Sequence, residues 1–484
     1  MVSDRQYFAG LVAVCIGLTA YRIWVIHLLG IDTYVDEAYY WGWSQHLDWG
    51  YYSKPPMIAA LIALSESVFG HTLVALKLPA LLSYPGTALV LFAIGRRYFS
   101  ARAGFWSGVT FMTMPLVAAL GLFVSTDAPL LFLWSLGLYA LLRALDTASW
   151  RYWLLVGFCF GLGMMTKYTM AAFAGSAFLV MIFSPAGRRQ LASLKPWTGF
   201  LVGVALFIPN IVWNADHGFP TFVHTAEITR LESRAFAPGE FLEFMGAQWA
   251  SIGPLLGIAL VMVLIRSSRL WGHEQSRALV LMTLPLIILV SVQALTGRAN
   301  GNWAAPSFVG ACLLVPAYFL KNDRKRLLAW AVGINMMLSV AIYHWPQIYA
   351  LSGQTLTAKK DPYKRARGWA ALAEQVRPYA NQYPDAAILA TERESLAQLI
   401  YYLQPKRWAA WHPSHHVMDQ YELTAPLTDD TPGPFLFVSE GSDISQIANR
   451  FSRTRYLGVA EVPVYPDLTR TRHLFLLEGF KGYK

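Results

Sequence analysis

Two adjacent carboxylates, Asp36 and Glu37, follow the first apolar run of the chain and could take part in acid–base chemistry. One of them could accept a proton from an acceptor hydroxyl, or orient an acceptor or a divalent metal ion. Equally, Asp36 could cap a helix that begins at Glu37, with the side chain of Glu37 solvated. The residues alone leave both alternatives open.

Aromatic residues and a lysine surround this acidic pair in the sequence. The aromatic residues are Tyr39, Tyr40, Trp41, Trp43, Trp49, Tyr51 and Tyr52. They could form a belt at a membrane interface, which is the commoner arrangement, or a surface on which a sugar stacks. Lys54 precedes Pro55 and Pro56, which stiffen the backbone. Its ammonium could bind a phosphate, although a lysine that extends to lipid headgroups is the simpler explanation.

Two further charged residues, Asp127 and Lys167, lie at breaks between apolar runs. Asp127 lies in the sequence Ser-Thr-Asp-Ala-Pro, which is also typical of a helix start. Lys167 lies in Gly-Met-Met-Thr-Lys-Tyr-Thr, at the centre of residues 152–183. This range is too short for two full spans of about 20 residues each, so it predicts a hairpin that turns inside the membrane.

Weaker polar candidates occupy two other segments and the C-terminal part of the chain. They are His217, His224, Glu227 and Arg230 in 214–248, Arg298, Asn300, Asn302 and Trp303 in 297–303, and His412, His415 and His416. Arg230 and Arg298 could each hold a phosphate through two hydrogen bonds. The His and Glu residues of 214–248 match no specific metal-binding spacing, and solvated loop residues are the commoner explanation. The three C-terminal histidines resemble a metal-binding group only weakly.

The composition predicts a polytopic membrane protein. Of the 484 residues, 55% are hydrophobic and 14% are charged, whereas about 25% is usual in soluble proteins. The net charge of +10 does not indicate nucleic-acid binding, because the basic residues fall in short loops between apolar runs. About eleven spans are predicted: 7–29, 72–95, 103–124, 127–142, 152–166, 169–183, 197–213, 249–265, 278–296, 303–320 and 327–345.

The basic loops predict the orientation of these spans. They carry Arg96, Arg97, Arg102, Arg143, Arg151, Arg188, Arg189, Lys195, Arg266, Arg269, Arg277, Lys321, Arg324, Lys325 and Arg326. They alternate with the segments 30–71, 214–248 and 297–302. The positive-inside rule therefore places the N-terminus in the cytoplasm and the candidate residues on the opposite, periplasmic side.

The chain is predicted to have two domains. Residues 1–345 form the membrane domain, with periplasmic loops at 30–71 and 214–248. Residues 346–484 have the composition of a small α/β domain, with helical patterns at 363–378 and 393–403 and β-like runs at 386–391, 435–439, 456–464 and 472–477. With an odd number of spans, this domain is expected in the periplasm. Cys15, Cys159 and Cys312 lie in apolar segments, where cysteine packs as a small hydrophobic residue.

Five of these segments, in order, resemble the polyprenyl-phosphate-sugar glycosyltransferases of the C-type membrane fold. They are Asp36-Glu-Ala-Tyr-Tyr-Trp, Tyr-Tyr-Ser-Lys54-Pro-Pro, Ser-Thr-Asp127-Ala-Pro, Thr-Lys167-Tyr-Thr and Asn302-Trp-Ala-Ala-Pro. The nearest branch is the bacterial one related to protein O-mannosyltransferases and to the lipid A aminoarabinose transferase. The resemblance covers the whole predicted membrane domain.

The resemblance implies an inverting transfer of a sugar from undecaprenyl phosphate to an acceptor on the periplasmic face of the inner membrane. Asp36 and Asp127, with Glu37 beside Asp36, would match the family's acids. The donor phosphate would lie near a set of basic and neighbouring residues, namely Lys54, Lys167, Tyr168, Arg298 and Arg230. The sugar or acceptor would contact Tyr39, Tyr52, Asn302 and Trp303. No cofactor is certain, and a divalent metal remains an option.

Lipid A or core lipopolysaccharide is the acceptor that this branch implies, with a protein hydroxyl as the alternative. The family commonly has an acid immediately before the loop lysine, where this chain has Ser53. If that acid holds a metal or an amino sugar, this protein lacks that function.

Two other classes of function compete with a glycosyltransferase. A transporter or lipid flippase also places charged residues at broken helices, but it binds its substrate near the membrane midplane. Here the acids gather on one side of the membrane. A sensor or assembly protein would leave the five segments unexplained.

Overall fold

The computed structural model describes residues 2–229, 236–266, 271–414 and 416–483. The chain divides into two compact units. The first, called here the helical unit, comprises Met1–Val25 and Lys54–Tyr343. The second, called here the sheet unit, comprises Ile26–Ser53 and His344–Lys484. Residues 26–53, part of which was expected as a loop of the membrane domain, thus cluster with the C-terminal residues.

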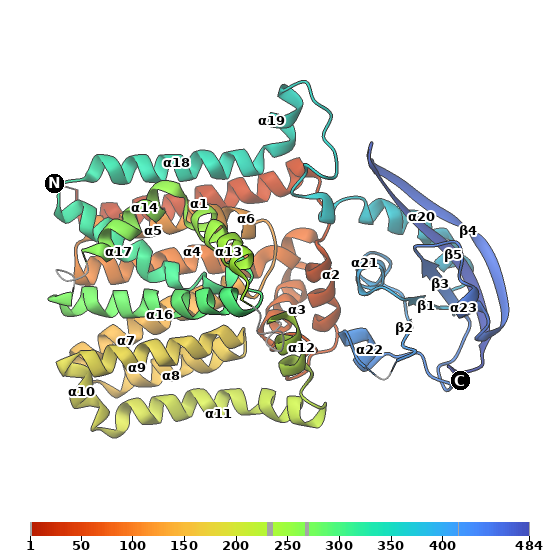
Figure 1. Ribbon diagram of the computed structural model, residues 1–484, viewed down its shortest axis with the longest axis horizontal. Helices are drawn as coiled ribbons and strands as arrows, with labels where there is room; N and C mark the ends of the chain where they lie inside the picture. Colours follow the sequence, from red (N-terminus) through yellow and green to blue (C-terminus); the bar gives the residue numbers. More distant parts are fainter. Residues whose placement is uncertain (1, 230–235, 267–270, 415, 484) are drawn as a thin grey trace. The chain divides into compact units, whose positions relative to one another are not determined.

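The helical unit is a bundle whose long helices lie roughly parallel to one another (Figure 1). Its α-helices are α1 (Asp4–Leu29, whose end belongs to the sheet unit), α3 (Met57–Phe69), α4 (Leu73–Tyr98), α5 (Ala101–Met112), α6 (Pro115–Leu120), α7 (Asp127–Thr147), α8 (Trp150–Met164), α9 (Ala171–Phe183), α10 (Pro185–Leu191), α11 (Leu194–Asp216), α12 (Pro220–Thr229), α13 (Pro238–Ile252), α14 (Pro254–Ile265), α16 (Glu274–Thr296), α17 (Ser307–Lys321) and α18 (Lys325–Tyr343). Two short 3₁₀ helices, η1 (Tyr168–Met170) and η2 (Gly301–Ala304), interrupt it.

Six helices in the described part of the chain are long and apolar enough to cross a membrane: α1, α4, α7, α11, α16 and α18. The number rises to eight if each of two bent pairs of helices counts as one span. One of these pairs, α13 and α14, bends by 104° at Gly253, where the sequence predicted one continuous span at 249–265. The fold is therefore that of a polytopic helical membrane protein, and the count of eleven spans stays a prediction.

The helices α8 and α11 approach each other closely because glycines line their contact. A Cβ atom added to Gly157 would lie 1.8 Å from the carbonyl oxygen of Gly199, and one added to Gly161 would lie 2.7 Å from that of Gly203. Each helix thus carries two glycines four residues apart, the spacing that lets membrane helices pack backbone to backbone.

The segment predicted as a hairpin consists of α8, the 3₁₀ turn η1 and α9. The two α-helices have 15 and 13 residues, so each is about 20 Å long at 1.5 Å per residue. Both are shorter than the roughly 30 Å core of a bilayer. The short lengths agree with the sequence, and a turn inside the membrane stays a prediction.

The sheet unit has one five-stranded sheet in the order β2-β1-β3-β5-β4. Its strands are β1 (Ala387–Ala390), β2 (Trp408–Ala410), β3 (Phe435–Ser439), β4 (Phe451–Tyr465) and β5 (Leu468–Phe480). Its helices are α2 (Val35–Ser44), α19 (Trp345–Leu351), η3 (Lys364–Ala366), α20 (Trp369–Gln382), α21 (Arg393–Leu403), α22 (Gln420–Thr424) and α23 (Ser445–Ala448). The pairs β1–β2 and β1–β3 are parallel, and the pairs β3–β5 and β4–β5 are antiparallel. A small C-terminal α/β fold was predicted, and the sheet confirms it.

Two helices of the sheet unit matter for the candidate site. The helix α21 contacts β1, β2 and α2. Because α2 carries Asp36 and Glu37, the C-terminal fold directly supports the acidic pair.

Candidate active site

Three residues from three of the family-like segments meet in the helical unit. The ammonium of Lys167 donates to Oδ1 of Asp127 over 2.7 Å, and the amide Nδ2 of Asn302 donates to Oδ2 over 2.7 Å. These three residues, called here the Asp127 cluster, lie up to 175 residues apart in the chain. The sequence predicted them as candidates on one side of the membrane, and their direct contact is a finding of the structure.

The elements around the Asp127 cluster fix its members. Asp127 is the first residue of α7, where the helix dipole favours a negative charge. Lys167 has an extended backbone between α8 and η1. Asn302 lies in η2, whose Gly301 carbonyl accepts a hydrogen bond of 2.8 Å from Gln248. Each polar side chain therefore projects from a helix end or a break.

The Asp127 cluster is shielded from solvent. The side chain of Asp127 is 3% exposed and that of Lys167 is 12% exposed. A buried charge is tolerated when it is paired and its remaining hydrogen bonds are made. Both carboxylate oxygens of Asp127 are occupied, whereas the Lys167 ammonium has three donors and Asp127 takes one of them. Lys167 is thus a fixed positive charge that can offer further donors to an anion.

Tyr168 does not join the Asp127 cluster. Its hydroxyl donates to Oδ1 of Asn210 over 2.7 Å and accepts from Nδ2 of Asn214 over 3.2 Å. Its ring stacks on Phe222 at 5.1 Å between ring centroids. These contacts join η1 to α11 and α12, so Tyr168 packs between these elements, and its role beside the donor phosphate stays a prediction.

The remaining candidates of the helical unit contribute less to the Asp127 cluster. Lys54 and Trp303 are half-buried, and Arg298 is exposed, with its backbone N–H donating to the carbonyl of Thr229 over 3.1 Å. Arg230 lies outside the described residues.

A second group of candidates lies in the sheet unit, on α2. Asp36 forms an ion pair with Arg393 of α21, with 3.3 Å between Oδ1 and Nη1. Burial lowers the pKa of the Arg393 guanidinium, but Asp36, Tyr39 and Tyr40 raise it by more, so its pKa lies above its usual value. Asp36 is 44% exposed in its side chain and remains open to a partner.

Glu37 serves the start of α2. It is fully buried, and its Oε2 accepts the backbone N–H of Tyr34 over 2.9 Å. The helix begins at Val35, one residue before Asp36. The alternative in which Asp36 caps the helix and Glu37 is solvated is therefore wrong, because the roles of the two carboxylates are reversed.

Most of the aromatic residues that follow α2's carboxylates are buried, and only Trp49 is well exposed. The rings of Trp43 and Tyr51 stack at 4.6 Å between centroids. Tyr39 and Tyr52, for which substrate contact stays a prediction, both interact with Gln420: the Gln420 N–H donates to the Tyr39 hydroxyl, and the Tyr52 N–H donates to Gln420 Oε1. Local sequence suggested a surface, but residues far along the chain cover these rings.

Two buried cations in the helical unit escaped the sequence analysis. Arg22 of α1 is 2% exposed, and it donates to the hydroxyl of Tyr343 and the carbonyl of Met112, both over 2.9 Å. Lys77 of α4 is fully buried, with its ammonium 4.9 Å from the ring centroid of Phe123. A charged residue inside an apolar run was the available signal, because such residues are costly in membranes.

No metal cluster was found within the described ranges, in that no three or more His, Cys, Asp or Glu side chains gather there. His412 pairs with Glu422 at 3.5 Å, and the ring of His217 stacks on Trp213 at 4.3 Å. The Asp127 cluster combines one carboxylate with a lysine and an amide, which is not a metal-binding set.

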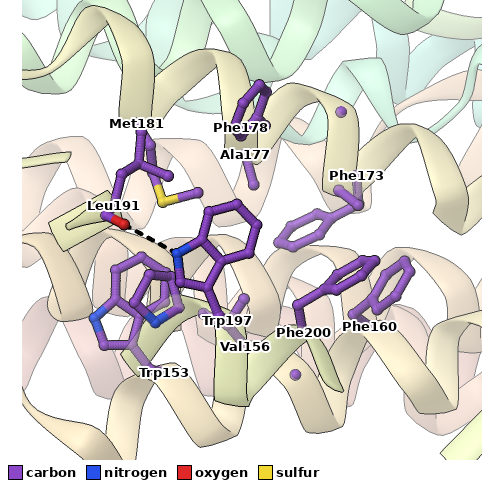
Figure 2. Close-up of a pocket in the computed structure, with 14 residues that line it drawn as sticks. Trp153, Val156, Phe160, Phe173, Ala177, Phe178, Met181, Leu191, Trp197 and Phe200 are labelled. Atoms are coloured by element: carbon purple, nitrogen blue, oxygen red, sulfur yellow. Dashed lines mark hydrogen bonds between the residues drawn. The ribbon is translucent and has the colours of Figure 1, made fainter. Parts of the chain in front are cut away.

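An apolar pocket of ≈ 330 Å³ opens among α8, α9 and α11 (Figure 2). Phe160, Phe173 and Phe200 lie at one end, and Trp153 and Leu191 lie at the other. The Nε1–H of Trp197 donates to the carbonyl of Leu191 over 2.9 Å. Because its lining is apolar, this pocket suits hydrocarbon and not a phosphate or a sugar.

Comparisons with known proteins agree on one family. A profile described as dolichyl-phosphate-mannose-protein mannosyltransferase matches residues 53–213. The lipid A galacturonosyltransferase RgtD of Rhizobium johnstonii is 30% identical over 437 residues, which cover 89% of this chain and 90% of that protein. An undecaprenyl phosphate-alpha-4-amino-4-deoxy-L-arabinose arabinosyl transferase of Pseudomonas fluorescens is 24% identical over 60% of this chain and 54% of its own length.

A solved structure extends the likeness to the fold. The crystal structure of ArnT from Cupriavidus metallidurans bound to undecaprenyl phosphate matches 97% of each chain with a TM-score of 0.65, at 16% sequence identity. At this identity the match supports the fold alone. It covers the residues of both units.

Proposed function

Because the chain belongs to the polyprenyl-phosphate-sugar glycosyltransferases of the C-type membrane fold, we propose that it transfers a sugar from a polyprenyl phosphate to lipid A or core lipopolysaccharide. The observation that carries this proposal is the Asp127 cluster. Three segments that the family resemblance singled out separately meet there through two hydrogen bonds of 2.7 Å.

The sugar that we propose is a uronic acid, galacturonic acid in the first instance. The relative that is 30% identical over nearly the whole chain is named a lipid A galacturonosyltransferase. Ser53 supports this choice, because an acid at that position would favour an amino sugar and repel a carboxylate.

The chemistry needs a positive charge where the leaving phosphate departs and a carboxylate near the acceptor. Lys167 offers the positive charge and offsets the negative charge that is released as the glycosidic bond breaks. Asp127 and Asn302 act as positioning residues, because Asp127 accepts from the ammonium and Asn302 holds the Asp127 carboxylate by donating to its other oxygen. Asp36 accepts the proton of the acceptor hydroxyl, or orients an acceptor that is already anionic.

The proposal includes an orientation and a domain division. The N-terminus lies in the cytoplasm, and residues 346–484 form a periplasmic domain after about eleven spans within 1–345. The alternation of basic loops supports this orientation. Lys54 and Arg298 are proposed as additional cations near the donor.

Reconstitution tests the proposed function. The purified protein is reconstituted in liposomes that contain lipid A and either polyprenyl-phosphate galacturonic acid or polyprenyl-phosphate aminoarabinose. The masses of the lipid products are then measured by mass spectrometry. We expect lipid A to gain one hexuronic acid residue, with no gain of aminoarabinose. Lys167→Met should abolish the product, because it removes the charge and keeps the length of the side chain.

Three outcomes would overturn the proposal. A gain of aminoarabinose alone would refute the choice of sugar. Glycosylation of a co-reconstituted protein with unmodified lipid A would favour the protein acceptor. Movement of intact donor between leaflets without any transfer would favour a lipid flippase.

A further inference from the structure

The acidic segment on α2 is fastened to the C-terminal fold by reciprocal hydrogen bonds. The Thr33 hydroxyl donates to Oε1 of Gln398 over 2.6 Å, and Nε2 of Gln398 donates to the Thr33 carbonyl over 2.9 Å. The Thr33 N–H also donates to the hydroxyl of Tyr402 over 3.0 Å. Thr33 and Gln398 are both buried, where hydrogen bonds hold geometry more tightly than at the surface. The residues before Asp36 thus have a fixed position on α21.

A second attachment holds the residues after Asp36. Gln420, the first residue of α22, binds the segment at two points. Its Oε1 accepts the Tyr52 N–H over 2.6 Å, and its own backbone N–H donates to the Tyr39 hydroxyl. The acidic segment is therefore held on both sides of Asp36 by residues more than 360 positions later in the chain.

Between these two attachments, Arg393 meets Asp36 itself. Its Nη1 lies 3.3 Å from Oδ1 of Asp36, and its guanidinium carbon lies 4.8 Å from the ring centroid of Tyr39. Both charged side chains are about 40% exposed. A pair as exposed as this contributes little to stability. Its consequence is therefore geometric: the ring and the carboxylate together fix the guanidinium, and the guanidinium fixes the direction of the carboxylate.

We propose that Arg393 is a positioning residue for Asp36, through which the C-terminal fold takes part in sugar transfer. Arg393 holds the carboxylate of Asp36 in one direction, while Gln398 and Gln420 hold the segment on either side of it. This inference rests on the proposed function, because it assigns the acceptor-side role to Asp36. It gives the C-terminal residues a catalytic purpose that the sequence did not indicate.

Steady-state kinetics of Arg393→Gln and Arg393→Lys test the proposal in the reconstituted full-length protein. A misplaced reacting group can cost about a hundredfold in rate. We therefore expect Arg393→Gln to lower kcat by ten- to a hundredfold, while KM for the donor lipid changes by less than about threefold. Arg393→Lys should recover part of kcat, because it keeps the charge and loses the planar fork.

Arg453→Gln is the matched control. Arg453 of β4 also pairs with a carboxylate in the same unit, Glu478 of β5 at 3.4 Å, and both of these side chains are exposed. The kcat of Arg453→Gln should equal that of the wild type. The thermal unfolding midpoint of all variants is measured in parallel, and only Arg393 variants that keep the wild-type midpoint are compared.

The outcomes separate this proposal from the proposed function. If the wild type transfers sugar and folded Arg393→Gln keeps its kcat, the positioning role is refuted and the function stands. The positioning role is also refuted, and the function stands, if Arg393→Lys has no higher kcat than Arg393→Gln and Asp36→Asn keeps the full wild-type activity. If the wild type transfers no sugar from any donor lipid, the proposed function fails first.

Discussion

At the scale of single residues, the two acids of the candidate site differ in what they have left to offer. Both oxygens of Asp127 already accept strong hydrogen bonds, from Lys167 and Asn302. Asp36 forms an ion pair with Arg393 and keeps an exposed side chain. A proton acceptor must be able to reach its proton donor. Asp36 is therefore better suited to meet the acceptor, and Asp127 is better suited to hold Lys167.

Asp127→Asn should reduce both activity and stability. The amide keeps the size of the side chain and removes the charge that balances the buried Lys167. Breaking a buried pair by removing one partner costs about 3–5 kcal/mol, so we expect a lower thermal unfolding midpoint and little transfer. Asp146→Asn is the control, because Asp146 is about 31% exposed and accepts from the Tyr98 hydroxyl. A wild-type rate and midpoint for Asp127→Asn would contradict the role given to Asp127.

Asn302 allows a test that depends on charge and not on size. Asn302→Asp has nearly the same shape, but it places a second carboxylate at the position that now lies 2.7 Å from Asp127 Oδ2. Two carboxylates so close disfavour ionisation of one of them. We expect a lower transfer rate for Asn302→Asp than for Asn302→Ala, which only loses a hydrogen bond. The reverse order, measured as initial rates, would mean that Asn302 acts somewhere other than on Asp127.

At the scale of elements, Glu37 acts through the first turn of α2. Glu37→Gln keeps an oxygen that can accept the Tyr34 N–H, so we expect transfer within about threefold of the wild type. Glu37→Ala loses this bond at the helix start, where such a loss costs about 1 kcal/mol, and should lower the thermal unfolding midpoint. A near-complete loss of transfer in folded Glu37→Gln would instead make Glu37 a catalytic acid.

The contact between α8 and α11 depends on the absence of side chains at its glycines. A Cβ on Gly157 would come within 1.8 Å of a carbonyl oxygen of α11, so Gly157→Ala must push the helices apart. Overpacking of this kind costs about 1–3 kcal/mol. We expect a lower thermal unfolding midpoint in detergent for Gly157→Ala. Gly175→Ala in α9 is the control, since a Cβ there meets nothing within 4 Å, and equal midpoints for the two variants would refute the close contact.

Elements with a strong local pattern could be predicted from the sequence. The predicted span at 327–345 corresponds to α18, and the helical pattern at 393–403 has the same bounds as α21. The bend at Gly253 was missed, although Gly253-Pro254 is a signal for a break. The hydrogen bonds of Tyr39 and Tyr52 could not be predicted, because their partner Gln420 lies more than 360 residues away. Local periodicity carries no information about such a contact.

At the scale of the whole molecule, the sequence predicted which residues belong to the candidate site but not which of them contact one another. The positive-inside rule assigned Asp127 and Lys167 to one face of the membrane, and the structure adds that they touch. The division of the chain into two units was harder to predict from the sequence. Residues 26–53 precede most of the helical unit, yet they belong with the sheet unit. Sequence order therefore suggested one domain boundary, whereas the chain passes between the two units three times, after Val25, Ser53 and Tyr343.

The proposed orientation predicts which residues an impermeant maleimide can reach in intact spheroplasts. The native Cys15, Cys159 and Cys312 are all buried, at 4%, 0% and 1% exposure, so the wild-type chain should label weakly and serve as the control. Ser442 and Arg189 are exposed positions, in the C-terminal residues and in the basic segment that forms α10. Ser442→Cys should label in intact spheroplasts, because residues after 345 are predicted to lie in the periplasm. Arg189→Cys should label only after lysis, since the basic loops are retained in the cytoplasm. The opposite labelling pattern would mean that the chain has the inverted orientation. The C-terminal fold and Asp36 would then lie on the cytoplasmic side, away from a periplasmic acceptor.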